Sequence, residues 1–136
     1  MKKKIEYRSD CPISTALDIF GDKWSLLIVR DMMFKGMNTY GEFLNGGEKI
    51  ATNILADRLM TLETGGIIVK QKHPQSKAKI LYTLSQKGIG LIPSLVEIIA
   101  WSEKHHEVHP QAKEFVKALK KDKAGVINGI ATSLKK

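Results

Sequence analysis

The chain has 136 residues, of which 43% are apolar and 26% charged, the composition of an ordinary soluble globular protein with one modest core. Its 22 basic and 14 acidic side chains give a net charge of +8, which favours an acidic partner such as nucleic acid. A lysine-rich soluble surface is the alternative interpretation. No apolar run approaches the roughly 20 residues that cross a bilayer, and the single cysteine forms no internal disulfide. We therefore expect a cytoplasmic protein with no membrane partner.

The first third of the chain predicts an arm followed by two helices. Residues 1–10 are expected to form an N-terminal arm. A first helix opens at Cys11-Pro12, because proline is well tolerated in a first turn, and Gly21 ends it. Asp22 is the predicted N-cap of a second helix, Lys23 to about Phe34, which has a wide apolar face.

The stretch from Thr39 to Gly66 predicts a short helix, a turn and a longer helix. Thr39 caps the short helix, and Glu42 three residues later completes a capping box. Asn45-Gly46-Gly47 is a strong turn signal. The longer helix is predicted to have Thr52 as its N-cap and to end at Thr64, before two glycines.

A hairpin is predicted directly after this pair of helices. Ile67–Lys72 and Lys79–Leu84 are strand-like runs on either side of residues 73–78, which suit a loose tip. Two helices, a turn and a hairpin in this order predict a mainly α protein with a small β-hairpin, arranged as a winged helix-turn-helix. Such a unit places one helix in the major groove of DNA.

The remainder of the chain predicts three further helical segments. Ser85 caps a long apolar helix, in which Pro93 produces either a kink or a later true start. Because this helix is apolar on more than one side, we interpret it as a dimer seam. A helix from Ala112 to Lys121 and a weaker helical stripe from Val126 to Leu134 follow.

These patterns divide the chain into three parts. They are an N-terminal arm (1–10), a winged helix-turn-helix domain with its dimerisation helix (11–106) and a basic helical C-terminal extension (107–136).

The helix from Thr52 is the predicted DNA-reading helix. Leu55, Leu59 and Leu62 lie on one face and point inward. The positions left toward solvent, with Arg58 near the edge, are Thr52, Asn53, Ala56, Asp57, Met60 and Thr61. Asn binds adenine edges, Arg binds guanine edges or phosphates, and Thr binds phosphates. Asp57 repels phosphate, so it either accepts from cytosine or orients Arg58. The alternative is an amphipathic helix whose polar face meets only water.

The hairpin is the predicted phosphate-binding wing. Between Lys70 and Lys79 there are four lysines and no acidic residue, with His73 as a further donor. The alternative is a solvated lysine-rich loop. Thr39, at the start of the short helix, is a further predicted DNA contact. The candidate DNA-binding residues are therefore Thr39, Thr52, Asn53, Ala56, Asp57, Arg58, Lys72, His73, Lys77 and Lys79.

Cys11 is the residue with a possible chemical response. A helix N-terminus and the nearby basic residues 2–4 and Arg8 favour a thiolate, which can be oxidised or pair with the cysteine of a second subunit. The alternative is a small buried residue that packs under the first helix.

No other pattern indicates chemistry. His105, His106 and His109 suit a helix end better than a metal site, because no carboxylate or cysteine completes a ligand set. There is no Gly-rich phosphate loop and no nucleophile elbow, so we expect neither an enzyme nor a cofactor or metal.

Several blocks resemble the HxlR-type transcriptional regulators, MarR-related winged helix-turn-helix proteins of bacteria and archaea. The blocks are Cys11-Pro12, ALDIFGDKWSLLIVR (16–30), YGEFL (40–44), LADRLMTLE (55–63), GII (66–68) and YTLSQKG (82–88). The resemblance covers roughly residues 9–106, and its G-x-K-W block is quite specific. Two features depart from the family pattern: Leu81 stands where an acidic residue is usual, and the hairpin loop is rich in lysine where arginine and proline are common. The stretch from Gln111 onward lies beyond the usual end of the family.

The resemblance implies a homodimer whose N- and C-terminal helices form the seam, bound to an operator with two half-sites. It supports Thr52, Asn53, Ala56, Asp57 and Arg58 as reading positions and the hairpin as the wing. Some relatives sense oxidants, quinones or aldehydes through the cysteine at the Cys11 position. The predicted function is a repressor on a pseudo-palindromic double-stranded DNA operator, with an oxidant or small-molecule effector. A winged-helix module that binds protein and not DNA is the alternative.

Overall fold

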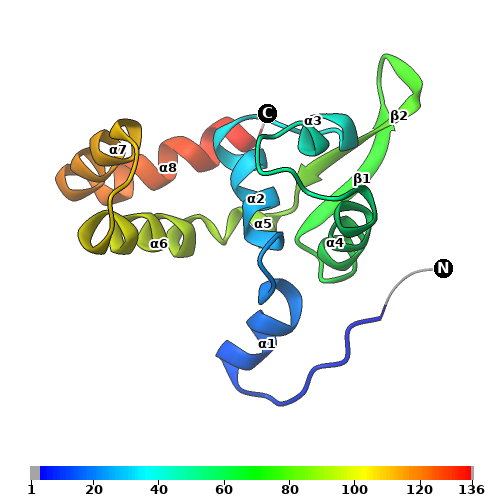
Figure 1. Cartoon of the computed structure of the whole chain (residues 1–136), viewed down its shortest axis with the longest axis horizontal. Helices are drawn as coiled ribbons and strands as arrows, with labels where there is room; N and C mark the ends of the chain where they lie inside the picture. Colours follow the sequence, from blue (N-terminus) through cyan, green and yellow to red (C-terminus); the bar gives the residue numbers. More distant parts are fainter. Residues whose placement is uncertain (1–3, 136) are drawn as a thin grey trace. The chain divides into compact units, whose positions relative to one another are not determined.

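The computed structural model describes residues 4–135, so expectations that fall on residues 1–3 and 136 lie outside it. The chain forms two compact units, one ending at Gly88 and one starting at Ile89 (Figure 1). The first unit holds α1 (Pro12–Phe20), α2 (Ser25–Phe34), α3 (Tyr40–Leu44), α4 (Thr52–Thr64), β1 (Ile68–His73) and β2 (Ser76–Leu84). The short α5 (Gln86–Ile89) follows β2, and the second unit holds α6 (Ile92–His105), α7 (Pro110–Lys121) and α8 (Lys123–Leu134). The predicted winged helix-turn-helix order is confirmed, whereas the three-part domain division stays a prediction.

Helix α4 is the centre of the first unit. It packs against α1, α2, α3 and β1. The prediction that its leucines point inward is confirmed, because Leu55 and Leu62 are completely buried and Leu59 is nearly so. The other buried apolar side chains of this unit are Ile19, Ile28, Val29, Met32, Met33, Phe43, Ile50, Ile67, Ile68 and Tyr82.

In the first unit, the starts of α1 and α3 follow the sequence, and those of α2 and α4 differ from it. The capping box of α3 is confirmed, since the N–H of Glu42 donates to Thr39 Oγ1 and the N–H of Thr39 donates to Glu42 Oε1. Thr52 is not the N-cap of α4. The carbonyl of Ala51 already accepts from Leu55 N–H, so Ala51 is the N-cap and Thr52 is the first helical residue.

Helix α2 begins two residues later than predicted. The carboxylate of Asp22 accepts from the N–H groups of both Trp24 and Ser25, at 2.8 and 2.9 Å. These bonds hold residues 22–24 in a turn, so Trp24 takes the N-cap position that the sequence assigned to Asp22. Asp22 nevertheless satisfies two N–H groups at the start of the helix.

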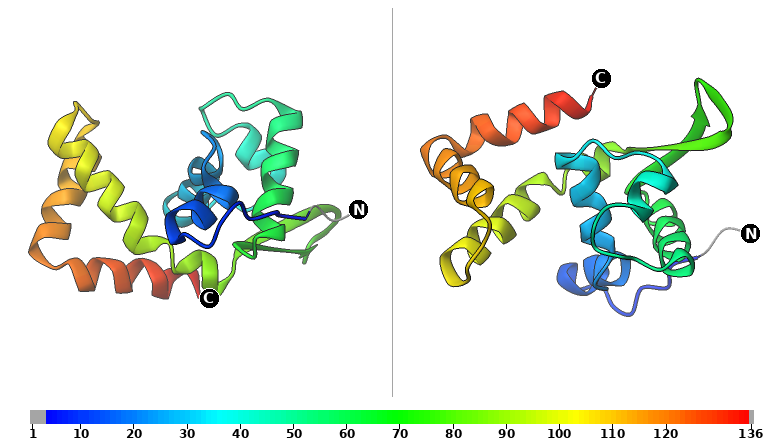
Figure 2. Two further views of the ribbon diagram at one scale, coloured as in Figure 1. Left: turned by 90° about the horizontal axis from the view of Figure 1, so that it is seen from below. Right: turned by 45° about the horizontal axis from the view of Figure 1, so that its top comes forward.

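The hairpin is longer and tighter than its sequence predicted. The strands continue to a turn at Pro74 and Gln75, in place of a loose tip over residues 73–78. The antiparallel register runs from Ile68–Leu84 to Lys72–Ile80 and then shifts, so that His73 pairs with Ser76. Between these two pairs β2 has three more residues than β1, and this shift lets the chain close in a short turn. The hairpin tip projects beyond the helices of its unit in Figure 1 and in the right-hand view of Figure 2.

Ser85 caps the four-residue α5 and not a long helix. Its hydroxyl accepts from Gly88 N–H at 3.0 Å and donates to the carbonyl of Gly66. Helix α6 starts at Ile92 with Pro93 in its first turn. Of the two predicted outcomes for Pro93, the later start is therefore correct, because proline lacks the N–H that a helix interior requires.

The second unit consists of three helices that pack on one another. The predicted helix 112–121 is confirmed as α7 with an earlier start, and His109 Nδ1 accepts from Ala112 N–H at its N-cap. The stripe from Val126 to Leu134 is confirmed as part of α8. Within residues 4–135, no helix is both long and apolar enough to span a membrane.

Gly88→Ala is expected to destabilise the first unit by about 1–3 kcal/mol, because the added methyl group would overlap backbone atoms that cannot move away easily. A Cβ at Gly88 would lie 2.3 Å from the carbonyl oxygen of Ile67. Gly41→Ala is the matched control in α3, where a Cβ would meet no atom within 4 Å. That change should be neutral or stabilise by up to about 1 kcal/mol. Urea unfolding of both variants measures the difference, and equal stabilities would contradict this packing.

Candidate nucleic-acid interface

The outer face of α4 carries most of the predicted reading positions. Thr52, Asn53 and Ala56 are exposed, and the side chain of Asp57 is 44% exposed. Thr61, which was expected to face solvent, is 4% exposed. Its hydroxyl donates to the carbonyl of Asp57 one turn earlier, which satisfies the donor inside the protein and permits burial.

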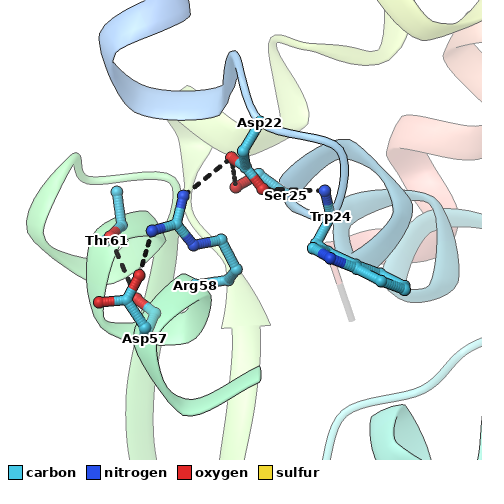
Figure 3. A network of polar contacts seen from close by, with 6 residues as sticks. All are labelled: Asp22, Trp24, Ser25, Asp57, Arg58 and Thr61. Carbon is cyan, nitrogen blue, oxygen red and sulfur yellow. Dashed lines mark hydrogen bonds and ion pairs between the residues drawn. The ribbon is translucent and has the colours of Figure 1, made fainter. Parts of the chain in front are cut away.

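Arg58 points toward the turn between α1 and α2 (Figure 3). Its guanidinium forms ion pairs with Asp22, at 3.2 Å between Nη1 and Oδ1, and with the neighbouring Asp57. Its side chain is 23% exposed. The hydrogen bond to Asp57 has the largest effect on the pKa of Arg58 and raises it. Burial lowers this pKa, but the charge of Asp22 adds to the rise, so the pKa lies above its ordinary value. The sequence left two roles open for Asp57, and the pairing with Arg58 is present in the structure.

Asp22 is held rigidly at the start of α2. Besides the two backbone N–H groups, the hydroxyl of the fully buried Ser25 donates to Asp22 Oδ1. Partial burial is the largest single effect on the pKa of Asp22 and raises it. The hydrogen bonds from Ser25 and Trp24 and the charge of Arg58 outweigh burial and lower this pKa below its ordinary value of 3.8. Asp22 therefore stays ionised at neutral pH.

A shallow hollow of ≈ 410 Å³ lies between α4 and the α1–α2 turn. Its lining residues are Asp22, Trp24, Asn53, Ile54, Asp57 and Arg58. The hollow brings two predicted reading residues, Asn53 and Asp57, next to Asp22, whose sequence position predicts only a helix cap. The ion pair between Asp22 and Arg58 had no local sequence signal, because the two residues belong to separate elements.

The lysines of the hairpin are all exposed, as a wing requires. These are Lys70, Lys72, Lys77 and Lys79. Lys70 lies 4.0 Å from Glu63 of α4. His73 is half-buried, and its Nδ1 accepts from Gln75 N–H at 3.1 Å, so this ring shapes the turn.

Thr39 and Lys79 line a second hollow, of ≈ 630 Å³, between α3 and β2. The other lining residues are Tyr40, Gly41, Glu42, Asn45, Ala78, Ile80 and Tyr82. The pKa of Glu42 lies below its ordinary value, and the hydrogen bond from Asn38 N–H is the largest cause. Hydrogen bonds from Thr39 and the charge of Lys79 lower it further. The hollow thus carries a fixed anion on the α3 wall and a cation on the β2 wall.

Cys11 is exposed and is the N-cap residue of α1. Its side chain makes no capping hydrogen bond, and its N–H donates to Ser9 Oγ at 3.2 Å. The alternative of a buried packing residue is therefore wrong. The position at the chain's first helix leaves the sulfur without cover from the core.

The histidines near the end of α6 have structural partners. The rings of His105 and His106 lie 5.2 and 5.5 Å from that of Trp101, while His109 caps α7. Over residues 4–135, no three His, Cys, Asp or Glu side chains gather as a metal site would require.

The family model described as HxlR-like helix-turn-helix matches residues 19–110 of this chain. YdeP of Bacillus subtilis, an uncharacterized HTH-type transcriptional regulator, is 32% identical over 110 residues, which cover 78% of this chain and 85% of YdeP. An uncharacterized HTH-type transcriptional regulator of Synechocystis, sll1512, is 35% identical over 86 residues, 63% of each chain.

Solved structures agree with these relatives. PA1607, a proposed transcription factor, is 39% identical with a TM-score of 0.67, over 76% of this chain and 70% of PA1607. The oxidised form of the redox regulator HypR is 27% identical with a TM-score of 0.62, over 72% of this chain and all of HypR. This chain belongs to the HxlR family and is a transcriptional regulator of the HxlR/MarR type. The relatives are regulators and not enzymes.

Asp22→Asn is expected to destabilise the first unit by about 1 kcal/mol at neutral pH, because a charged acceptor of helix N–H groups is lost. Since the folded-state pKa of Asp22 lies below 3.8, the carboxylate stabilises the fold above that pH and loses its effect as the pH falls through the folded value. The stability difference between wild type and variant should therefore shrink in acid.

Urea unfolding of wild type and variant, from neutral pH down to about pH 3, measures this convergence. Asp18→Asn is the control, because Asp18 accepts from the exposed backbone N–H of Arg8 and not from the N–H groups at the start of α2. If the stability difference between wild type and Asp22→Asn did not change with pH, the stabilising role of the ionised Asp22 carboxylate would be contradicted.

Proposed function

We propose that this regulator is a sequence-specific DNA-binding repressor, which acts in the cytoplasm as a homodimer on a pseudo-palindromic operator. One observation carries the proposal: in a chain of the HxlR family, the exposed polar face of α4 accompanies a projecting hairpin with four exposed lysines. Helix α4 lies in the major groove, and the hairpin follows the phosphates beside it.

The proposed DNA contacts divide into contacts to bases and contacts to phosphates. On the outer face of α4, Asn53, Ala56 and Asp57 meet the base edges, and Thr52 meets the nearest phosphate. The phosphate contacts come from the hairpin and the α3–β2 hollow, and the residues are Thr39, Lys72, His73, Lys77 and Lys79. Arg58 was predicted to be a reader, and its two ion pairs favour a supporting role beneath the reading face.

Exposed apolar side chains on α1 and α6 support the homodimer. Ile13 and Leu17 of α1 are 71% and 54% exposed, and Ile98 and Trp101 of α6 are 49% and 58% exposed. Large apolar side chains at such exposure on two helices are typical of a surface that a partner covers. A second copy that covers them places two α4 helices on successive half-sites, ~34 Å apart.

Operator binding should weaken steeply with salt, because lysine–phosphate contacts release counterions. Lys77→Ala should weaken binding to operator and to random DNA equally and reduce the salt slope by about 1. Asn53→Ala should instead cost about 1–3 kcal/mol on the operator and little on random DNA. Gel shifts with an operator selected from random duplexes measure both. The opposite pattern would refute the division of contacts, and no binding to any duplex would favour the protein-interaction alternative.

We also propose that an oxidant or electrophile releases the DNA by reacting with Cys11. The thiol is exposed at the start of α1, a helix of the proposed dimer seam, and the structural relative HypR is a redox regulator. Oxidation that joins the two Cys11 thiols of a dimer, with the oxidant taking up two electrons and two protons, shifts the seam and hence the spacing of the α4 helices.

Diamide should release wild-type protein from its operator and leave Cys11→Ser protein bound. Non-reducing electrophoresis should show a disulfide-linked dimer in the wild type alone. Recovery of binding after added dithiothreitol is the control for damage. Release of the Cys11→Ser protein by diamide would rule out this sensor.

A further inference from the structure

Asp57 is an acidic residue on the face of α4 that the proposed function turns toward DNA. Its side chain is 44% exposed, whereas Glu63, the other acidic residue of α4, is half-buried in the last turn beside Lys70. A carboxylate that approaches DNA is repelled by the phosphates. Such a residue is favourable at the interface only where it accepts a hydrogen bond from a base.

The major-groove edges of the bases differ in what they offer a carboxylate. Guanine presents two acceptors there, and thymine presents an acceptor and a methyl group. Adenine presents an amino donor beside the N7 acceptor, which repels a second carboxylate oxygen. Cytosine presents its N4 amino group as a donor, so cytosine is the base that an acidic reader selects.

Asp57 is held in place from behind. Arg58 binds the Asp57 carboxylate and, through Nη1, the carboxylate of Asp22 at 3.2 Å (Figure 3). Asp22 is in turn fixed by Trp24 N–H, Ser25 N–H and the buried Ser25 hydroxyl. The chain of contacts therefore runs from the start of α2 to the exposed carboxylate on α4.

This support has two physical effects. The positive guanidinium reduces the repulsion between Asp57 and nearby phosphates. It also restricts the rotamers of Asp57 before DNA arrives, which lowers the entropic cost of a base contact. A carboxylate has about four lone-pair sites, so pairing with Arg58 does not by itself prevent Asp57 from accepting a hydrogen bond from a base.

We propose that Asp57 selects a cytosine in each half-site of the operator, and that Arg58 and Asp22 are positioning residues that hold its carboxylate. The proposal rests on the proposed function, because it requires that α4 reads DNA. It assigns Arg58 to the support of a reading residue and gives Asp22 a role in specificity without a contact to DNA.

Selection from a random duplex library with full-length wild-type protein should yield a motif with one cytosine per half-site, preferred by about tenfold. With Asp57→Asn the preference at that position should change to adenine, because asparagine pairs with its N6 and N7. The other positions should keep their bases. Glu63→Gln is the matched control on the same helix and should leave the motif unchanged.

Arg58→Lys keeps the charge but loses the planar fork that joins two carboxylates. Both Arg58→Lys and Asp22→Asn should reduce the cytosine preference to about twofold or less and leave random-DNA affinity within about twofold. Asp18→Asn is the control for charge loss near α1. Thermal melts verify folding, and Arg58→Lys decides the matter if Asp22→Asn does not fold.

The outcomes separate the two hypotheses. Wild-type protein that binds no duplex refutes the proposed function itself. A wild-type motif whose cytosine is unchanged by Asp57→Asn, or that has no cytosine, refutes the role of Asp57 alone. An equal loss of preference at every position in both Arg58→Lys and Asp22→Asn refutes the positioning role, because it indicates a general displacement of α4.

Discussion

The burial of the leucine face of α4 is the constraint on which the rest of the first unit depends. Leu55, Leu59 and Leu62 are all at or near complete burial, and a fully buried leucine stabilises a fold by about 1.5–3 kcal/mol. Helices α1, α2 and α3 and strand β1 all pack against α4. Because the leucines face inward, helical geometry leaves Asn53 and Ala56 outside, so the proposed reading face is a consequence of the core.

Two groups of charged side chains in this unit have different surroundings, the hairpin lysines and the ion pairs around α4. The hairpin lysines are exposed on a projecting element, as suits contacts to phosphates that are insensitive to sequence. The charges around α4 instead form a linked set, in which Arg58 joins the Asp22 and Asp57 carboxylates. In the proposed function, DNA affinity and sequence specificity thus reside on different elements. The Asp22 link also connects the reading helix to the turn that follows α1, the helix that begins after Cys11.

Local sequence signals predicted the elements well and their ends less well. The Thr39–Glu42 capping box and the inward leucines were found because each depends on spacing within one helix. The starts of α2 and α4 were displaced, since Asp22 folds a turn ahead of the helix and Ala51 closes the first turn of α4. The tight hairpin tip has no clear sequence signature, because it depends on a register shift in which β2 has three more residues than β1.

The sequence by itself determined the winged helix-turn-helix order, the inward leucine face of α4 and the hairpin with its lysines, because hydrophobic periodicity, caps and turn residues act over a few positions. The tertiary structure alone decided what the polar residues of α4 do. Thr61 is buried despite its polar type, and Arg58 is turned away from the outer face by Asp22, which belongs to another element. Ion pairs between distant residues depend on how helices pack, so no local pattern reveals them.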